Sequence, residues 1–203
     1  MKKDLDLVRI VSYIFFDGHL CKYLKCFYLS SKNTKDLNEF EKIINRKLKV
    51  KGKYYFNDGG GGITKTHKYR VFSRKICREL EKLGVPKGSK TNKSYLVPEW
   101  IMGDKVFSKE FIRIAYLCEG TMKEKRKNPR ISINMHKSEE HIDNGIEFME
   151  QLREILEKNG IKTTSIGVYK ARERKDRVKV RVLRFRVLTD YNNRFIKAIG
   201  WFK

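Results

Sequence analysis

Two apolar segments, roughly half a chain apart, each end in a carboxylate followed by a glycine. The first, residues 5–18, has apolar side chains at helical spacing and ends in Asp17 and a glycine. The second, residues 107–120, has the same spacing and ends in Glu119 and a glycine, with Ser108 expected to cap its start. Such a repetition indicates one folding unit written twice.

The segments that follow each apolar helix also match. Each half offers a strand pair, an amphipathic helix, a second hairpin and a closing helix, and a glycine follows that closing helix. We therefore predict an α+β fold of two repeats related by a pseudo-two-fold axis, αββαββα each. The first repeat is expected at residues 1–86 and the second at 107–203, joined by a linker at 87–106 with proline and glycine punctuation.

The strands are expected to form two antiparallel sheets, with the two acid-tipped helices at the centre and the sheets shaped as a saddle. Along the last long strand, Lys179 and Arg181 alternate with apolar residues, and a phase shift at Leu183 would bring Arg184 and Arg186 to the same face. A basic strand face of this kind suits the DNA major groove, whose base edges carry a full donor and acceptor code.

Charge points to a polyanionic partner. The 203 residues include 47 Lys and Arg against 24 Asp and Glu, a formal net charge of +23. A thermophile surface would raise both signs, so it does not explain this excess of base. A membrane-surface helix would concentrate its charge on one segment, whereas here the basic residues spread along the chain. Nucleic acid is the expected partner, and no membrane partner is expected.

The cysteines predict a cytoplasmic protein, and binding to DNA would make it nucleoid-associated. Cys21, Cys26, Cys77 and Cys118 form neither a C-x-x-C pair nor a zinc-finger spacing, so we interpret them as reduced thiols. The N-terminal apolar run is interrupted by charges, and no stretch reaches the length of a membrane span. The chain also lacks the Cys or Ser start and the His-Asn end of splicing chemistry, so no splicing activity is expected of it.

These features together resemble the double-motif LAGLIDADG homing endonucleases of archaeal introns and inteins. The first motif resembles IVSYIFFDG at residues 10–18, and the second resembles IRIAYLCEG at residues 112–120. Residues 83–89 and 95–101 resemble a linker found ahead of the second motif, and residues 194–202 resemble the family's ending. The likeness covers nearly the whole chain.

The resemblance implies a monomeric, metal-dependent endonuclease that hydrolyses phosphodiester bonds in double-stranded DNA. Asp17 and Glu119, with Gly18 and Gly120, would hold Mg²⁺ or Mn²⁺, one reaction serving each strand. Lysines near the helix–strand junctions would stabilise developing phosphate charge, and we take Lys32 and Lys137 as equivalent catalytic candidates.

The target is expected to be long and asymmetric, because the two halves differ in sequence. The candidate DNA contacts are basic or aromatic residues on or beside the expected strands. They are Lys22, Lys25, Tyr28, Arg70, Arg74, Lys123, Lys125, Arg130, Lys170, Lys179, Arg181, Arg184 and Arg186.

One departure from the family keeps other functions open. The family's two central helices touch through small side chains, whereas here the contact positions are Ser12, Phe16, Ile114 and Cys118, two of which are large. The alternative is therefore a cleavage-deficient binding protein, an RNA maturase or a DNA-binding regulator. A third possibility, a basic ribosomal or structural component, gives no reason for the paired acid-tipped helices.

Overall fold

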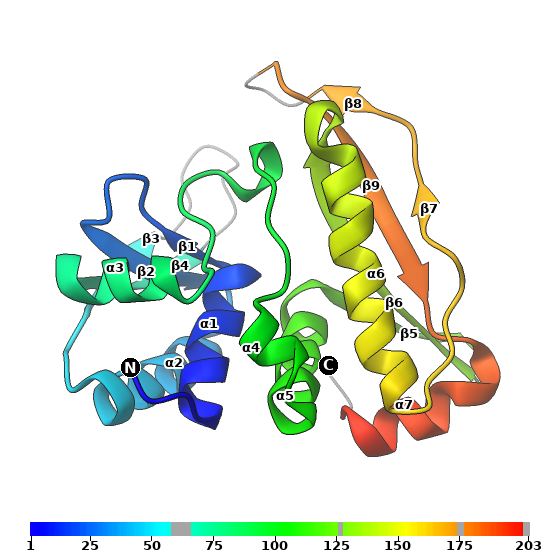
Figure 1. Ribbon diagram of the computed structural model, residues 1–203, viewed down its shortest axis with the longest axis horizontal. Coiled ribbons are helices and arrows are strands. Elements are labelled where there is room, and N and C mark those ends of the chain that lie inside the picture. The colour runs from blue at the N-terminus through cyan, green and yellow to red at the C-terminus, as the bar shows by residue number, and fades with distance from the viewer. Residues whose placement is uncertain (58–65, 126–127, 174–176, 201–203) are drawn as a thin grey trace. The chain divides into compact units, whose positions relative to one another are not determined.

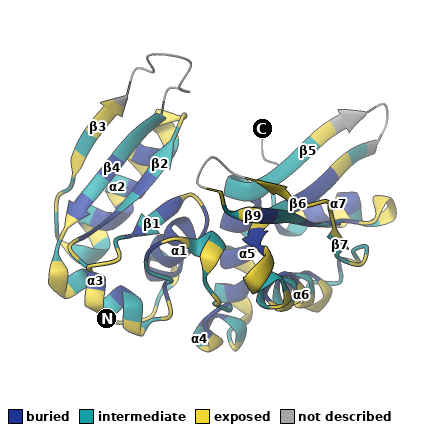
Figure 2. Cartoon of the chain, turned by 90° about the horizontal axis from the view of Figure 1, so that it is seen from above, coloured by how far each residue is buried: buried dark blue, intermediate teal, exposed yellow. Residues whose placement is uncertain are grey.

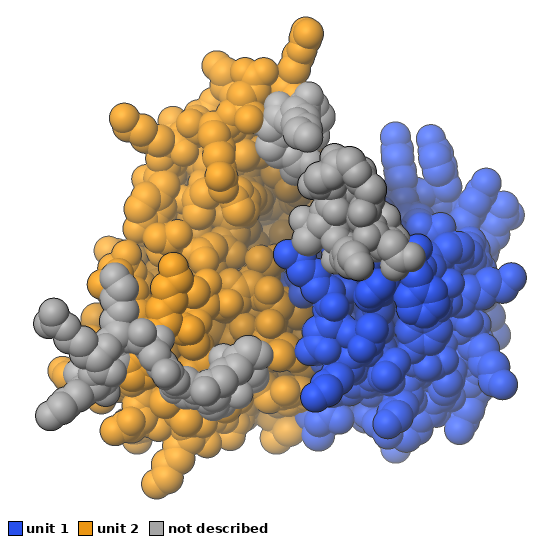
Figure 3. Space-filling view, turned by 180° about the vertical axis from the view of Figure 1, so that it is seen from behind, with its two compact units in different colours: residues 1–88 blue, residues 89–203 orange. Residues whose placement is uncertain are grey.

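The computed structural model describes the chain except for residues 58–65, 126–127, 174–176 and 201–203. It divides into two compact units, Met1–Gly88 and Ser89–Lys203 (Figure 3). The linker was expected at residues 87–106, and the division after Gly88 groups residues 89–106 of it with the second unit. No helix in the described ranges is both long and apolar enough to cross a bilayer.

The first unit follows the predicted order of elements. Sheet A has the strand order β1-β2-β4-β3, and every neighbouring pair is antiparallel (Figure 1). The elements are α1 (Leu5–Phe15), β1 (Gly18–Leu20), β2 (Cys26–Ser31), α2 (Thr34–Leu48), β3 (Lys53–Asn57), β4 (Thr66–Phe72) and α3 (Arg74–Lys82).

The helices of this unit cover one face of sheet A (Figure 2). Phe40 of α2 is fully buried and meets Tyr13, Phe27 and Tyr69 edge to face, with ring centroids 5.7, 6.5 and 6.3 Å away. Edge-to-face pairs add about 0.5–1.5 kcal/mol each beyond the area they bury. One aromatic side chain thus joins α1, α2 and both central strands.

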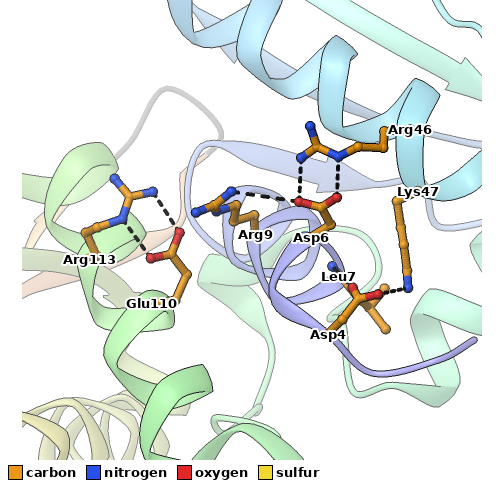
Figure 4. Close-up of polar contacts among 8 residues, drawn as sticks. All are labelled: Asp4, Asp6, Leu7, Arg9, Arg46, Lys47, Glu110 and Arg113. Carbon is orange, nitrogen blue, oxygen red and sulfur yellow. Dashed lines mark hydrogen bonds and ion pairs between the residues drawn. The ribbon is translucent and has the colours of Figure 1, made fainter.

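Ion pairs fix the start of α1 against the end of α2 (Figure 4). The Asp6 carboxylate accepts from Arg46 Nε and a terminal nitrogen at 2.6 Å each, and Lys47 pairs with Asp4. Asp4 also caps α1 by accepting from the Leu7 backbone N–H at 3.0 Å. The hydrogen bond from Arg46 holds the pKa of Asp6 below its usual value, although burial opposes this shift.

The second unit repeats the plan with additions. Sheet B has the order β5-β6-β9-β7, with β8 also paired to β9. Its elements are η1 (Lys90–Asn92), α4 (Glu99–Met102), α5 (Lys105–Glu119), β5 (Gly120–Lys125), β6 (Asn128–Ser138), η2 (Glu139–His141), α6 (Ile142–Lys158), β7 (Gly167–Val168), β8 (Arg172–Glu173), β9 (Lys179–Arg186), η3 (Thr189–Tyr191) and α7 (Asn192–Ala198). The αββαββα repeat is thus confirmed in both units. The saddle concerns the placement of one unit against the other and stays a prediction.

Residues 89–97 lie along α6 through backbone hydrogen bonds. The Tyr95 N–H donates to the Asn144 side-chain oxygen at 2.9 Å, and the Val97 N–H donates to that of Gln151 at 2.7 Å. The Ser138 hydroxyl donates to the Thr91 carbonyl at 3.1 Å. Since an unpaired backbone group is costly when buried, these side chains explain why the segment folds with the second unit.

Helix α5 begins earlier than predicted. Its cap is Asp104, whose carboxylate accepts from the backbone N–H groups of Val106 and Phe107 at 2.8 and 2.9 Å. Ser108, the predicted cap, lies inside the helix and is buried. The cap prediction was wrong because an acceptor one turn earlier reaches the free N–H groups. A second ion pair, Arg113 with Glu110, lies on this helix (Figure 4).

The cysteines also differ from expectation. Cys21 and Cys26 form a disulfide across the turn between β1 and β2, so the prediction of four reduced thiols was wrong for these two. Cys77 and Cys118 are not in a disulfide, and burial raises the pKa of the Cys77 thiol to about 11. Facing positions at the base of a tight hairpin bring two Cα atoms to 5.6 Å, a distance suited to a disulfide.

Candidate functional site

Gly18 carries the chain from α1 directly into β1. A Cβ on Gly18 would lie 2.7 Å from the Ile14 Cα and 2.8 Å from the Tyr28 carbonyl oxygen, both backbone atoms. Only glycine therefore fits this turn. The preceding residue, Asp17, is exposed, so the turn places a carboxylate at the end of α1 with its side chain open to solvent.

Gly120 does the same in the second unit. A Cβ there would lie 2.2 Å from the Tyr116 carbonyl oxygen, and the Gly120 N–H donates to that oxygen. Glu119 is the last residue of α5 and is half-buried. Burial first, and then the Glu119 carboxylate, raise the pKa of the Tyr95 hydroxyl, so this carboxylate lies within electrostatic range of Tyr95.

The strand register shows that the two glycine turns are equivalent. Gly18 faces Leu29 across β1 and β2, and Gly120 faces Ile133 across β5 and β6. Counting from these pairs matches Tyr28 with Ser132, and their neighbours in the next strand, Arg70 and Arg186, are also matched. In each unit, therefore, an arginine lies two strands away from the strand that begins at the glycine turn: Arg70 on β4 and Arg186 on β9.

The same count corrects one predicted equivalence. Lys32 lies three residues after Leu29, and the residue three after Ile133 is His136. Lys137 therefore corresponds to Asn33, the cap of α2, rather than to Lys32. The first hairpin is two residues shorter than the second, since Leu29 lies 11 positions after Gly18 and Ile133 lies 13 positions after Gly120.

Lys32 and Lys137 lie in opposite environments. Lys32 is exposed after β2. Lys137 is completely buried; its ammonium donates to the carbonyls of Lys90, at 3.2 Å, and Lys93, and lies 4.0 Å from the centre of the Tyr95 ring. Burial lowers the pKa of Lys137 to about 8. This position suits an internal anchor for residues 90–95, and it does not open Lys137 to a phosphate.

The donors available for a divalent metal are of the right chemical type. Asp17 and Glu119 supply carboxylate oxygens, and the carbonyls of Gly18 and Gly120 supply further oxygen donors, which hard cations prefer. Within the described residues, no three His, Cys, Asp or Glu side chains lie together so that they could hold a metal ion by themselves. Beside either carboxylate, phosphate and water oxygens would complete the coordination of a bound ion.

In the first unit the predicted DNA contacts fall into three places. Lys22 and Lys25 are exposed on the β1–β2 turn. Tyr28 and Arg70 lie together on the face of sheet A opposite its helices, with the guanidinium 5.1 Å from the ring centre. Arg74 is exposed but belongs to α3 rather than to a strand.

In the second unit the predicted single basic stripe is wrong. The pairing of β6 with β9 is continuous from Ser132↔Arg186 to Ser138↔Val180, without a bulge at Leu183. Regular alternation therefore sets Arg184 and Arg186 on one face and Lys179 and Arg181 on the other, which also carries Leu183.

The remaining contacts of that unit are placed as follows. Arg181 pairs with Glu139 at 3.0 Å, and the Arg184 guanidinium donates to the Asn134 side-chain oxygen. Lys123 and Arg130 face each other across β5 and β6 and are exposed. Lys170 and Lys179 are exposed, and the side chain of Lys125 lies outside the described residues.

Sequence reasoning missed three residues beside Arg70. Tyr55 and Lys68 are register partners on β3 and β4, and Phe72 lies two residues beyond Arg70. The sequence of β4 did contain a sign of this face. Apolar Tyr69 and Val71, which are buried, alternate with Lys68, Arg70 and Phe72, so these three residues lie on the opposite face.

Sequence comparison finds curated archaeal relatives but no matching protein-family model. The chain is 31% identical over 168 residues to the tRNA-splicing ligase RtcB of Pyrococcus abyssi, covering 78% of this chain and 18% of the relative. It is 28% identical over 221 residues to the DNA-directed RNA polymerase subunit Rpo1N of Methanocaldococcus jannaschii, covering 96% of this chain and 16% of the relative. The chain thus spans less than a fifth of these relatives.

Structural comparison identifies the fold. The homing endonuclease I-DmoI in complex with DNA and Mn matches with a TM-score of 0.59 and 14% identity, covering 97% of each chain. The N-terminal LAGLIDADG domain of WhiA matches with a TM-score of 0.59 and 16% identity, covering 99% of this chain and 84% of that one. Together with the two helix–acid–glycine turns, these matches show that the chain has the LAGLIDADG fold.

Proposed function

We propose that this protein is a site-specific endonuclease that cuts double-stranded DNA, with Asp17 and Glu119 as its metal-holding carboxylates. The observation that carries the proposal is the equivalence of the two glycine turns, each of which sets one carboxylate at a helix end beside the first strand of a sheet. Two equivalent acids, one per unit, suit a substrate with two equivalent backbones. The proposal is supported by the fold likeness to I-DmoI bound to DNA and Mn.

The residues of the chain have separate tasks in this proposal. The sheet faces and their turns bind the duplex, and the net charge of +23 attracts it. The carboxylates hold the ions, while Gly18 and Gly120 fix the backbone positions of those acids. Exposed Lys32 is available to meet a phosphate, whereas buried Lys137 holds residues 90–95 in place.

Mg²⁺ or Mn²⁺ held by these oxygens would supply a Lewis acid that activates water and stabilises the leaving 3′ oxygen. The donor set fits such an ion because carboxylate, carbonyl and phosphate oxygens are all hard ligands. Dependence of cutting on added divalent cation is the direct expectation.

The curated relatives support a mobile insert rather than a shared cellular role. An RNA ligase, an RNA polymerase subunit and a replication factor C small subunit have unrelated names, yet each matches this chain over 9–18% of its own length. A segment common to unrelated hosts does not carry the hosts' activities. We therefore propose an intron- or intein-associated origin and transfer none of the hosts' functions to this chain.

The decisive experiment selects cut sites from a random or genomic DNA library in the presence of Mg²⁺. Asp17→Asn and Glu119→Gln should each abolish double-strand cutting, by about 10³-fold or more, while duplex binding persists. Glu147→Gln, an exposed acid on α6, is the matched control and should cut like the parent. Cutting that survives both substitutions would show that the active site is elsewhere.

A binding protein that has lost cutting is the second candidate. The chain has the same TM-score, 0.59, to the WhiA domain and to I-DmoI, so likeness of fold does not distinguish a binding protein from an endonuclease. Phe16 and Ile114 are both buried large side chains at positions where the family uses small ones. Tight, sequence-selective duplex binding without cutting under any divalent cation would establish this candidate.

A further inference from the structure

The hairpin that follows Asp17 has a short ladder. Strand β1 has three residues, and its pairing with β2 ends at Leu20↔Phe27. The equivalent hairpin of the second unit has six residues in β5, and its pairing with β6 continues to Lys125↔Asn128. Each cross-strand pair adds to the stability of a hairpin, so the turn after β1 receives less support from its own strands than the turn after β5.

A disulfide closes the end of this short ladder. Cys21 and Cys26 come directly after the last register pair, and their Cα atoms are 5.6 Å apart. Within the closed ring the Cys21 N–H donates to the Cys26 carbonyl at 3.0 Å, and the Leu24 N–H donates to the Cys21 carbonyl at 2.8 Å. The sequence of the β5–β6 hairpin contains no cysteine, so this closure has no counterpart there.

The closed turn contains a residue in the left-handed region of the backbone. Leu24 has a φ of 52°, which non-glycine residues rarely adopt because Cβ is crowded there. A turn that is free to relax would leave this conformation for others, whereas the covalent ring from Cys21 to Cys26 restricts the alternatives. Breaking the S–S bond should therefore loosen this turn.

The same turn presents side chains that the proposed function gives to DNA. Lys22, Tyr23 and Lys25 are exposed, and the Lys22 ammonium lies 5.7 Å from the centre of the Tyr23 ring. Holding these side chains in one arrangement lowers the conformational entropy that is lost when they meet phosphates. A fixed turn should therefore bind a duplex more tightly than a loose one.

We infer that the Cys21–Cys26 disulfide is a redox-sensitive switch of DNA binding. In the disulfide form the β1–β2 turn holds Lys22 and Lys25 ready for backbone phosphates, and in the dithiol form the affinity for duplex falls. The inference rests on the proposed function in taking duplex DNA as the ligand. It goes further in making the affinity of the first unit depend on the oxidation state of the chain.

The disulfide is reduced by exchange with a dithiol reductant. Cys26 is buried and Cys21 is half-buried, so a thiolate reaches the Cys21 Sγ more readily. Attack there forms a mixed disulfide with Cys21 and releases Cys26 as a thiolate, which takes up a proton. The second thiol of the reductant loses its proton and attacks the reductant sulfur of the mixed disulfide, which releases Cys21 to be protonated. The chain gains two electrons and two protons, and the reductant becomes a disulfide.

Anisotropy of a fluorescent, mixed-sequence duplex titrated with the full chain, without divalent cation, tests this inference. Reduction with dithiothreitol should weaken binding about fivefold, the order expected when two long side chains must be ordered on binding. The slope of log Kd against log salt should fall by up to about 2, because each lost phosphate contact removes about 0.9. Oxidised dithiothreitol should restore both values. The reduced parent carries no substitution, so the comparison does not depend on a variant that folds.

Two double variants locate the effect. Cys21→Ser with Cys26→Ser should bind like the reduced parent with or without reductant. Lys22→Gln with Lys25→Gln keeps the disulfide and should lose most of the response to reduction. Alkylation in denaturant followed by mass spectrometry reports the state of the parent, with two labelled thiols before reduction and four after it.

Three outcomes would each overturn the inference: equal affinities of the oxidised and reduced parent, a response to reductant that survives in the double-serine variant, or four labelled thiols before any reduction. Absence of cutting by the parent under Mg²⁺ is a separate result. It would refute the proposed endonuclease and leave a redox-dependent affinity for duplex standing.

Discussion

In sheet A the Arg70 guanidinium lies among three aromatic rings, whereas in sheet B the Arg184 guanidinium lies against the single ring of Tyr169 and donates to the Asn134 side-chain oxygen. The two sheets nevertheless share one register, in which Tyr28 corresponds to Ser132 and Arg70 to Arg186. The glycine turns and the strand order thus stayed alike while the exposed faces diverged. Two unlike faces on one backbone plan suit an asymmetric ligand.

The largest effect is expected at the feature that the units share. Gly120→Ala and Gly18→Ala should each lower the free energy of unfolding by about 3 kcal/mol, because the new methyl meets backbone that must move. Gly120 should be the more sensitive, since its nearest atom is 2.2 Å away compared with 2.7 Å for Gly18.

Urea denaturation followed by circular dichroism measures both glycine variants. Gly103→Ala is the control, because a Cβ there would meet only the Glu99 carbonyl oxygen at 3.3 Å and the backbone φ is −76°. If Gly18→Ala were as stable as that control, the two turns would not be equivalent in their packing.

The next prediction concerns a difference between the units, the buried Lys137. Burial lowers its pKa from 10.5 to about 8, so between these values the unfolded chain binds more protons than the folded one. Stability contributed at this site should therefore rise with pH across that window. Lys137→Met removes the titration, and the parent should gain stability relative to this variant from about pH 8 to about pH 10.5. Parallel stability curves would contradict the burial of the ammonium.

The position equivalent to Lys137 in the first unit gives a smaller effect of another kind. Asn33 caps α2 by accepting from the Lys35 backbone N–H at 3.0 Å. Asn33→Ala should cost about 1 kcal/mol in thermal or urea unfolding, without the pH dependence expected at Lys137. Asn33→Asp is the conservative control and should retain the cap. If Asn33→Ala left the free energy of unfolding unchanged, Asn33 would not stabilise α2 as a cap.

The smallest effect is expected at Asp6, whose pKa is lowered by the hydrogen bond from Arg46. A lowered carboxyl pKa stabilises the fold above the ordinary value of 3.8, and this contribution is lost as pH falls through the folded value. The melting temperature of Asp6→Asn should thus be slightly below that of the parent at neutral pH, and the two should converge in acid. Because Arg46 is largely exposed, solvent screening keeps the difference small.

Periodicity and glycine placement predicted the order of elements because they depend on neighbours within a few residues. The α1 and α5 helices, their carboxylates and the strands that follow were all visible in this way. The Ser108 cap failed by one turn, since a nearby Asp104 competes for the same N–H groups.

The other predictions that proved wrong depended on contacts between residues far apart in the sequence. A hairpin two residues longer in the second unit shifted the true partner of Lys32, and pairing with β6 kept β9 free of the expected phase shift. Nothing local marks Lys137 as buried, because its acceptors are the carbonyls of Lys90 and Lys93. The rings around Arg70 likewise needed the pairing of β2, β3 and β4 to become visible.

Gly145 of α6 leaves a notch over sheet B. A methyl at that position would lie 2.6 Å from the Lys137 Cγ and 2.7 Å from the Leu183 Cδ1. The three sites therefore form one steric unit, in which a larger residue at 145 would be tolerated only with a shorter partner at 137 or 183. Homologues that lose this glycine should show a matching truncation opposite it, so that helix, lysine stem and strand change together.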